Sequence, residues 1–299
     1  MKQALYLLLA LACYCTNGYA DKTIQMNDVQ KMGLKGKVKS YAQYEVKTIN
    51  DTLVKDYLKR LTLFDEKGNK TESNTFNRNH ETTGRTKSKV GPKGKVLEEK
   101  TYNKNGEETA KTDNAYDKKG RLVRSVKFGK QGDTLSTWAF TYDKKGRKQT
   151  SEYKDKEKTL NATYTYDKKG NVSEMTIYKN QVLSKKEDFT YDKDGRLTAW
   201  AKSNGKDTTH TTETKYNAWG MQTGKRVYLN GTLQELFIYE NDNRGNKTAT
   251  YHYNGNKEKT EALIDIEYSN YDQYDNKTLR HKIKGGVTVE GEINEYTYY

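Results

Sequence analysis

The stretch YDKKG occurs three times, at residues 116–120, 142–146 and 166–170, and a near copy, YDKDG, occupies residues 191–195. Weaker copies extend the series on both sides, so that its glycine recurs every 24 to 26 residues. A constant period of this length indicates a repeat protein, here of about nine units over residues 36–299. The marker residues are Gly68, Gly94, Gly120, Gly146, Gly170, Gly195, Gly220 and Gly245, with Asp275 in the glycine position of a degenerate copy.

Each repeat carries two turn signals separated by alternating segments. Asp followed three residues later by Gly is typical of a type I turn whose amide hydrogens the aspartate accepts. A second signal, such as Asn230-Gly231, falls near the middle of the unit and favours a tight hairpin. Between the turns, apolar residues alternate with Thr, Lys and Glu, as in TWAFTYD (137–143), which is the period of a strand.

The sequence therefore predicts an all-β fold. We expect a long antiparallel meander of about nine 25-residue repeats with two strands each, about eighteen strands, in a twisted or curled open sheet. In each copy, the tyrosine closes a strand on the buried face, the aspartate stabilises the turn, and the glycine adopts the left-handed conformation. These structural repeat residues are Tyr116, Asp117, Gly120, Tyr142, Asp143, Gly146, Tyr166, Asp167, Gly170, Tyr191, Asp192 and Gly195.

The composition sets the thickness of this fold. Hydrophobic residues make up 32% of the chain, 25 of the residues are tyrosines, and the formal net charge is +14. Few apolar residues with a high net charge are typical of disordered chains, but many aromatic residues in strict alternation argue against disorder. We expect a thin sheet in which tyrosine covers the surface that Leu or Ile would cover elsewhere.

Residues 1–20 are typical of a secretory signal peptide. Lys2 precedes an apolar run from Ala4 to Cys15, which is too short to span a bilayer as a helix, and small residues precede Asp21. We expect cleavage after Ala20 and export to the periplasm, the outer membrane or the outside of the cell. Lipidation at Cys13 is the alternative. Both cysteines lie in this segment, so its removal leaves no thiol for catalysis, disulfides or metal binding.

Residues 21–35 lie between this leader and the repeats. We predict an N-terminal linker or cap there, in which NDVQKM (27–32) forms one helical turn over the edge of the first strand. The expected organisation is thus a signal peptide at 1–20, a cap at 21–35 and one repeat domain at 36–299.

The segments FTYDKKGR (140–147), TYTYDKKGN (163–171) and FTYDKDGRL (189–197) resemble the Tyr-Asp repeat of the Rhs/YD-repeat family, whose motif is YxYDxxG[RN]. The resemblance extends from about residue 60 to the end and implies a β-repeat fold in an envelope or surface context. In large members such repeats form a shell around a toxin. This chain ends in a partial repeat and its only proline is Pro92, so the proline-containing self-cleavage signature is absent and toxin delivery is not implied. It is more similar to short, stand-alone secreted members. MORN-type repeats, which share Tyr and Gly at similar spacing, are the alternative.

Residues for catalysis or cofactors are scarce. The four histidines, His80, His210, His252 and His281, lie in different units without metal-ligand spacing, and we interpret them as stray surface residues. Equivalent motif aspartates share one environment, whereas glycoside hydrolysis needs two carboxylates with separated pKa values. We predict no catalytic residues, no metal and no cofactor. A glycan-active enzyme remains a third hypothesis.

The lysines of the turns are the residues that the fold does not require. An even number of strands per unit places every motif turn on one edge, where the lysines form a row that could bind a polyanion such as an acidic glycan or lipid phosphate. Solubility is the alternative role, and export disfavours nucleic acid as a ligand. The tyrosine row (Tyr142, Tyr166, Tyr191, Tyr216) is either sheet packing or a stacking platform for sugars. The candidate anion-binding residues are Lys118, Lys119, Lys144, Lys145, Lys168, Lys169 and Lys193.

The first functional hypothesis follows from the array and from the missing catalytic groups. We expect a non-enzymatic exported β-repeat protein that presents an extended surface to a protein or glycan partner at the bacterial cell envelope. The polyanion binder is the alternative.

Overall fold

The computed structural model describes residues 26–50, 52–243, 245, 247–256, 266–284 and 287–299. The predicted leader, its cleavage site after Ala20 and Cys13 lie outside these residues. Within them, helix is limited to α2 (Asp28–Lys31) and to a 3-10 turn, η1 (Pro92–Gly94). The remainder is strands and turns, which confirms the predicted all-β class.

Twenty strands in the described part of the chain belong to one antiparallel sheet, compared with the eighteen or so that were expected. The paired strands follow the chain order of a meander, and the contacts divide the chain into two compact units. The middle unit comprises Trp138–Asn241 and the described residues that follow at 251–256. The terminal unit comprises the described residues within 26–137, 242–250 and 266–299.

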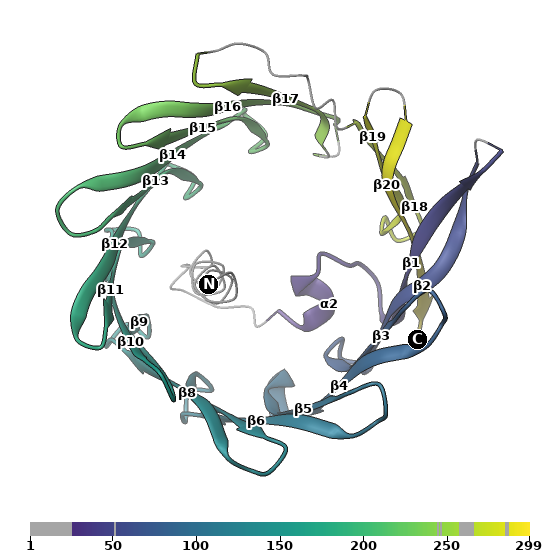
Figure 1. Cartoon of the computed structure of the whole chain (residues 1–299), viewed down its shortest axis with the longest axis horizontal. Helices are drawn as coiled ribbons and strands as arrows, with labels where there is room; N and C mark the ends of the chain where they lie inside the picture. The colour runs from purple at the N-terminus through teal and green to yellow at the C-terminus, as the bar shows by residue number, and fades with distance from the viewer. Residues whose placement is uncertain (1–25, 51, 244, 246, 257–265, 285–286) are drawn as a thin grey trace. The chain divides into compact units, whose positions relative to one another are not determined.

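The terminal unit brings the last strand of the chain beside the first. Tyr41 pairs with Tyr296 across β1 and β20, and the order of strands runs β18–β19–β20–β1–β2 and onward to β7 (Figure 1). Its strands are β1 Val38–Ile49, β2 Thr52–Phe64, β3 Lys70–Phe76, β4 Thr82–Val90, β5 Val96–Tyr102, β6 Glu108–Tyr116, β7 Leu122–Gly129, β18 Ile266–Tyr271, β19 Lys277–Lys284 and β20 Val287–Tyr298.

Helix α2 belongs to the terminal unit and follows the predicted helical turn. Asn27 caps it and forms a capping box with Gln30, which satisfies amides at the start of the helix. Val29 is buried against Val38 and Phe64. The expectation that this turn covers the edge of the first strand is wrong, because β2 and β20 pair with both edges of β1.

The part of the sheet in the middle unit has one buried face. Ala162, Tyr164, Val172, Met175 and Ile177 form its core cluster, whereas Thr163 and Thr165 on the opposite face are exposed. The alternation in the sequence therefore separates the two faces as expected. The strands are β9 Lys148–Asp155, β10 Thr159–Tyr166, β11 Val172–Lys179, β12 Val182–Tyr191, β13 Leu197–Ser203, β14 Thr208–Tyr216, β15 Gln222–Leu229 and β16 Thr232–Asn241, while β8 (Thr134–Tyr142) and β17 (Lys247–Asn254) include the unit boundaries.

Strand β12 departs from the simple pattern. A register shift opposite Ile177 and Tyr178 breaks the alternation, and Leu183, which strict alternation with Phe189 and Tyr191 would place on the buried face, is 40% exposed. Further along, Glu187 is only 4% exposed on the face of the core cluster. Its two carboxylate oxygens accept hydrogen bonds from Lys185 and from the Trp200 indole, so the buried charge is paired.

Candidate functional site

The motif turns have the same backbone geometry in successive units. In the turn at residues 167–171, the Gly170 amide donates to the Asp167 carbonyl at 3.1 Å, and the Asp167 amide donates to the Asn171 carbonyl at 2.9 Å. Oδ1 of Asp167 accepts the amides of Lys169 and Asn171, both at 2.9 Å. This is a type I turn closed by a glycine with positive φ. All eight marker glycines have positive φ, and so does Asp275.

In several motif turns, the side chain of the residue after the glycine completes the turn. Arg121, Arg147 and Arg196 each donate from Nε to Oδ2 of the motif aspartate four residues earlier, at 2.6–2.7 Å. Asn171 uses its side-chain amide in the same way, at 2.9 Å. No role was predicted for this position, although Arg or Asn follows the glycine in six of the eight copies.

The motif tyrosines connect neighbouring strands at the same edge. The Tyr166 hydroxyl donates to the Lys148 carbonyl at 2.6 Å, and the hydroxyls of Tyr116 and Tyr216 bond equivalent carbonyls. Arg147 also lies over the Tyr166 ring, 4.3 Å from its centroid. The arginine that neutralises one aspartate therefore packs on the tyrosine of the next repeat.

These contacts determine the charge state of the aspartates. Hydrogen bonds from the backbone amide and then the side chain of Arg121 hold the pKa of Asp117 below its ordinary value. Burial would raise the pKa of Asp143, but hydrogen bonds from the amide and guanidinium of Arg147 outweigh it and lower that pKa. The carboxylates are thus held ionised as acceptors for their own turns, which is the opposite of the raised pKa that a general acid needs.

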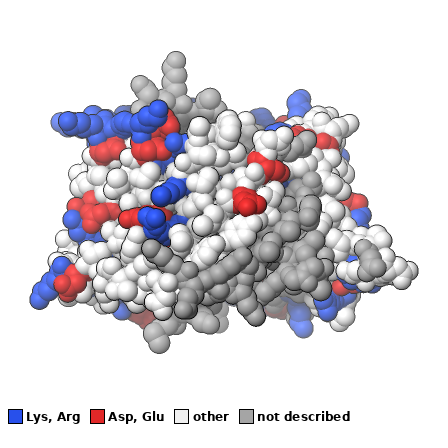
Figure 2. Space-filling model, turned by 90° about the horizontal axis from the view of Figure 1, so that it is seen from above, with Lys and Arg blue, Asp and Glu red and all other residues white. Residues whose placement is uncertain are grey.

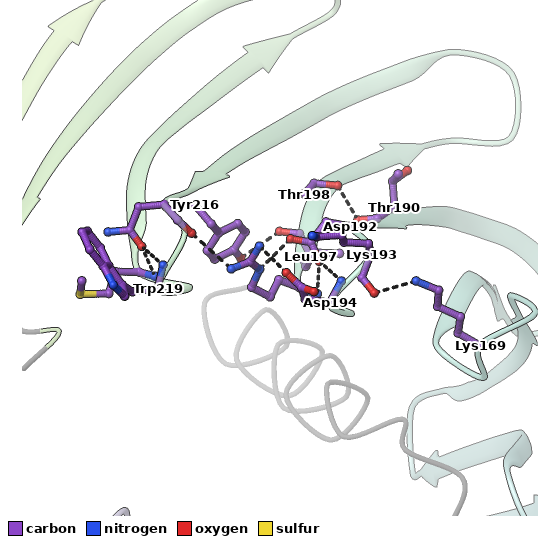
Figure 3. Close-up of polar contacts among 12 residues, drawn as sticks. Lys169, Thr190, Asp192, Lys193, Asp194, Leu197, Thr198, Tyr216 and Trp219 are labelled. Atoms are coloured by element: carbon purple, nitrogen blue, oxygen red, sulfur yellow. Dashed lines mark hydrogen bonds and ion pairs between the residues drawn. The ribbon is translucent and has the colours of Figure 1, made fainter.

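Among the described residues, the side chains of the turn lysines in the middle unit make no ion pair with the motif carboxylates. In the middle unit, the turns at 143–147, 167–171, 192–196 and 217–221 all follow even-numbered strands, and we call this side of the unit the motif edge. Its lysines are exposed, and within the described residues none has an acidic partner in ion-pair distance. Lys169 donates to the Lys193 carbonyl at 2.8 Å and so connects one turn to the next (Figure 3). The motif edge brings together Lys144, Lys145, Lys168, Lys169 and Lys193, whereas Lys118 and Lys119 are exposed in a motif turn of the terminal unit.

Other surface charges are mixed. On the face that Figure 2 shows, basic and acidic side chains lie close to one another rather than in one continuous basic area. The ordered row of lysines is therefore a feature of the turns and not a general consequence of the net charge of +14.

The histidines lie apart from one another. His80 and His210 are exposed, but His252 is half-buried and its ring stacks on Phe237 with 4.6 Å between centroids, so it is not the stray surface residue expected from the sequence. In the described part of the chain, no group of three or more His, Cys, Asp or Glu residues is placed to hold a metal ion.

A hollow in the terminal unit was not indicated by the sequence. It is open, has a volume of about 790 Å³, and is lined in part by Asp272, Asn294, Tyr296 and Tyr298. Burial, together with the Asp272 carboxylate, raises the pKa of Tyr298 to about 12. The Tyr296 hydroxyl donates to the Lys277 carbonyl at 2.9 Å, and that of Tyr298 donates to Asp272. These two hydroxyl groups therefore hydrogen-bond to other residues of the terminal unit.

Comparisons with known proteins are limited to remote structural similarities. No family model and no curated protein matches the sequence. A chain of the Photorhabdus luminescens Tc holotoxin pore matches 82% of this chain at 11% identity and a TM-score of 0.35, and a chain of the TcdB2–TccC3–Cdc42 complex matches 85% at 14% identity and the same TM-score. The chain spans only 17% and 16% of the length of these two chains.

A porin-like protein of Bacteroides uniformis is similar over 89% of this chain and 99% of its own, at 11% identity and a TM-score of 0.33. At these values the similarities say nothing about function, and the resemblance to YD repeats still depends on the sequence motif. Among the described residues, no helix is long and apolar enough to cross a membrane.

Proposed function

We propose that this chain is a non-enzymatic, exported β-repeat protein that presents an extended surface to a protein or glycan partner at the cell envelope. The observation that carries the proposal is the repetition of one turn geometry along the motif edge, where Asp143, Asp167, Asp192 and Asn217 each accept the amides of their own turn. Hydrogen bonds from Lys169 and Arg196 connect two of these turns to the next. Repeat proteins of this kind offer long, regular surfaces in place of one converging site.

Site-specific photo-crosslinking in intact cells tests this proposal. A photoreactive residue is placed at the equivalent exposed positions Lys144, Lys168 and Lys193 in three successive motif turns of the middle unit, and at Lys206 on the opposite edge as the control. An extended surface predicts the same adduct from at least two of the three motif turns. An adduct from one position alone, or from none, would contradict it.

The second candidate function is a polyanion binder. A specific observation favours it: the motif carboxylates are occupied by turn amides and by Arg147, Asn171 or Arg196, so they do not neutralise the lysines beside them. Each repeat contributes two strands, so the ammonium groups of successive turns lie about 10 Å apart. Such a row of positive charges suits the binding of a linear anion.

Binding of inorganic polyphosphate at several salt concentrations tests this second candidate. The affinity should fall steeply as salt rises, because exposed charges are screened beyond roughly 8 Å at physiological ionic strength. The triple variant Lys144→Gln, Lys145→Gln, Lys168→Gln should lose most of the affinity. An affinity that neither salt nor the triple variant changes would leave solubility as the role of these lysines.

A further inference from the structure

One motif turn of the middle unit carries a tryptophan where its neighbours carry charge. In the turn at 217–221, Asn217 Oδ1 accepts the amides of Trp219 and Met221 at 3.0 Å, as the motif aspartates do for Lys169 and Asp194 in their own turns. Trp219 therefore occupies the position equivalent to Lys169 on a turn of the same geometry. Its side chain is 83% exposed, the highest value among the exposed large hydrophobic residues of the described chain.

This turn is physically continuous with the lysine turns. Lys169 contacts the turn at 192–196 through the Lys193 carbonyl, and Arg196 Nη1 donates to the Asn217 carbonyl at 3.4 Å (Figure 3). Two-strand steps place successive turns about 10 Å apart, so the four turns extend over roughly 30 Å. Cationic side chains and an exposed indole thus share one edge of one unit.

We propose that the motif edge of the middle unit docks on an anionic lipid bilayer. Trp219 enters the interface between headgroups and acyl chains, and Lys144, Lys145 and Lys168 face the lipid phosphates. The inference deepens the proposed polyanion-binding function and depends on it, because the same lysines supply the positive charge.

The combination of groups selects a bilayer over a soluble anion. A dissolved polyphosphate can use the lysines, but it offers nothing to an exposed indole. Tryptophan is enriched at membrane interfaces because its ring is apolar and its N–H is polar. Lysines close to an anionic leaflet each strengthen binding by roughly fivefold. A single exposed tryptophan is ordinary on a protein surface, but here it stands on a braced turn in line with the lysine turns.

Vesicle binding of the purified chain tests the proposal. Vesicles of phosphatidylcholine mixed with phosphatidylglycerol should bind the protein, and vesicles of phosphatidylcholine alone should bind it much less. The variant Lys144→Gln, Lys145→Gln, Lys168→Gln should weaken binding roughly a hundredfold. The matched control, Lys154→Gln, Lys179→Gln, Lys206→Gln, removes three exposed lysines near the opposite edge of the same unit and should weaken binding far less.

Tryptophan fluorescence tests the insertion directly. The chain has three tryptophans, and Trp138 and Trp200 are half-buried. Anionic vesicles should shift the emission to the blue, brominated lipids should quench it, and Trp219→Ala should remove both effects and weaken binding severalfold.

The outcomes of these experiments distinguish bilayer docking from the polyanion-binding function on which it depends. Tight binding of polyphosphate with no vesicle binding, or vesicle binding that Trp219→Ala leaves unchanged, would overturn bilayer docking and leave the polyanion function in place. Failure to bind either probe would reject both.

Discussion

At the scale of single residues, the repeat motif separates into side chains that the fold uses and side chains that it leaves exposed. Asp167 accepts two backbone amides with one oxygen and the Asn171 amide with the other. Tyr166 donates to the Lys148 carbonyl, and Gly170 has a φ of 91°. Lys168 makes none of these contacts. The fold therefore uses the tyrosine, the aspartate and the glycine of the motif, and turn lysines such as Lys144, Lys145 and Lys168 remain available to a ligand.

The aspartate gives a first prediction. Asp167→Ala leaves two turn amides without their acceptor and should lower the free energy of unfolding by about 1–2 kcal/mol, measured by urea denaturation. Asp167→Asn should cost much less, because Asn217 already performs the same role in the turn at 217–221. Equal losses in the two variants would show that charge, and not the amide acceptor, stabilises the turn.

The degenerate copy gives a second prediction. Asp275 has a φ of 66° in the position that glycine takes elsewhere, and the left-handed region costs a non-glycine residue about 1 kcal/mol. Asp275→Gly should raise the melting temperature by a few degrees, because the lost ion pair with Lys35 is exposed and contributes little. Lys35→Gln, which removes only the ion pair, is the control. A lower melting temperature for Asp275→Gly alone would contradict this reasoning.

Much of this residue-level structure could be predicted from the sequence, since the turn aspartate and glycine are dictated by backbone geometry. The role of Arg147 and Arg196 could not, because it depends on side chains reaching back across the turn and onto the next tyrosine. The candidate role of Trp219 could not be predicted from the sequence for another reason. The repeat sequence shows that it replaces a lysine, but its exposure becomes clear only in the fold.

At the scale of the element, the unit is a hairpin closed by a motif turn and attached to its neighbour by a tyrosine hydroxyl. Alternation predicted which face of β10 is buried, because only local periodicity is needed. It failed at the start of β12, where a register shift leaves Leu183 exposed, whereas Lys185 and Glu187 keep the alternation and lie on the buried face. A bulge is decided by the pairing of two strands, and the sequence of one strand does not reveal it.

The motif turns predict how stability depends on pH. Asp117, Asp143, Asp167 and Asp192 all have a pKa below the ordinary value, so their stabilisation is fully present above the pKa of the unfolded chain, about 3.9. It is lost as the pH falls through their lower folded values. Urea denaturation should therefore show stability falling below about pH 4, and Asp192→Asn should reduce that slope. A slope unchanged by Asp192→Asn would contradict the assignment for this turn.

At the scale of the whole molecule, the feature that the sequence did not predict is the pairing of β20 with β1. Periodicity reports the local unit but not the strand that pairs with the first one, since that contact spans more than 250 residues. In the terminal unit, the segment before β1 stabilises the join, that is, the pairing of β20 with β1. Asn27 donates to the Lys67 carbonyl, and Asn276 accepts the Lys35 amide and donates to the Lys35 carbonyl.

Substitution of Asn276 tests whether this segment stabilises the pairing of β20 with β1. It is 2% exposed, and its side chain bonds both backbone groups of Lys35 and the Tyr298 hydroxyl. Asn276→Ala should cost about 2–3 kcal/mol and speed hydrogen exchange in β20, because a buried amide loses its acceptor. Asn171→Ala removes the equivalent side chain, whose contacts stay within its own turn, and should cost less. Similar costs and unchanged exchange in β20 would argue against a role for Asn276 in this join.

The central claim is that one motif contains scaffold residues and separate binding lysines, and polyphosphate affinity measured on two folded variants tests it most directly. Lys144→Gln, Lys145→Gln, Lys168→Gln should lose most of the affinity at unchanged stability. Asp143→Asn, Asp167→Asn should be somewhat less stable and bind at least as tightly as the unaltered chain, since each change removes a negative charge beside the lysines. Loss of binding in the aspartate variant with full binding in the lysine variant would contradict the account.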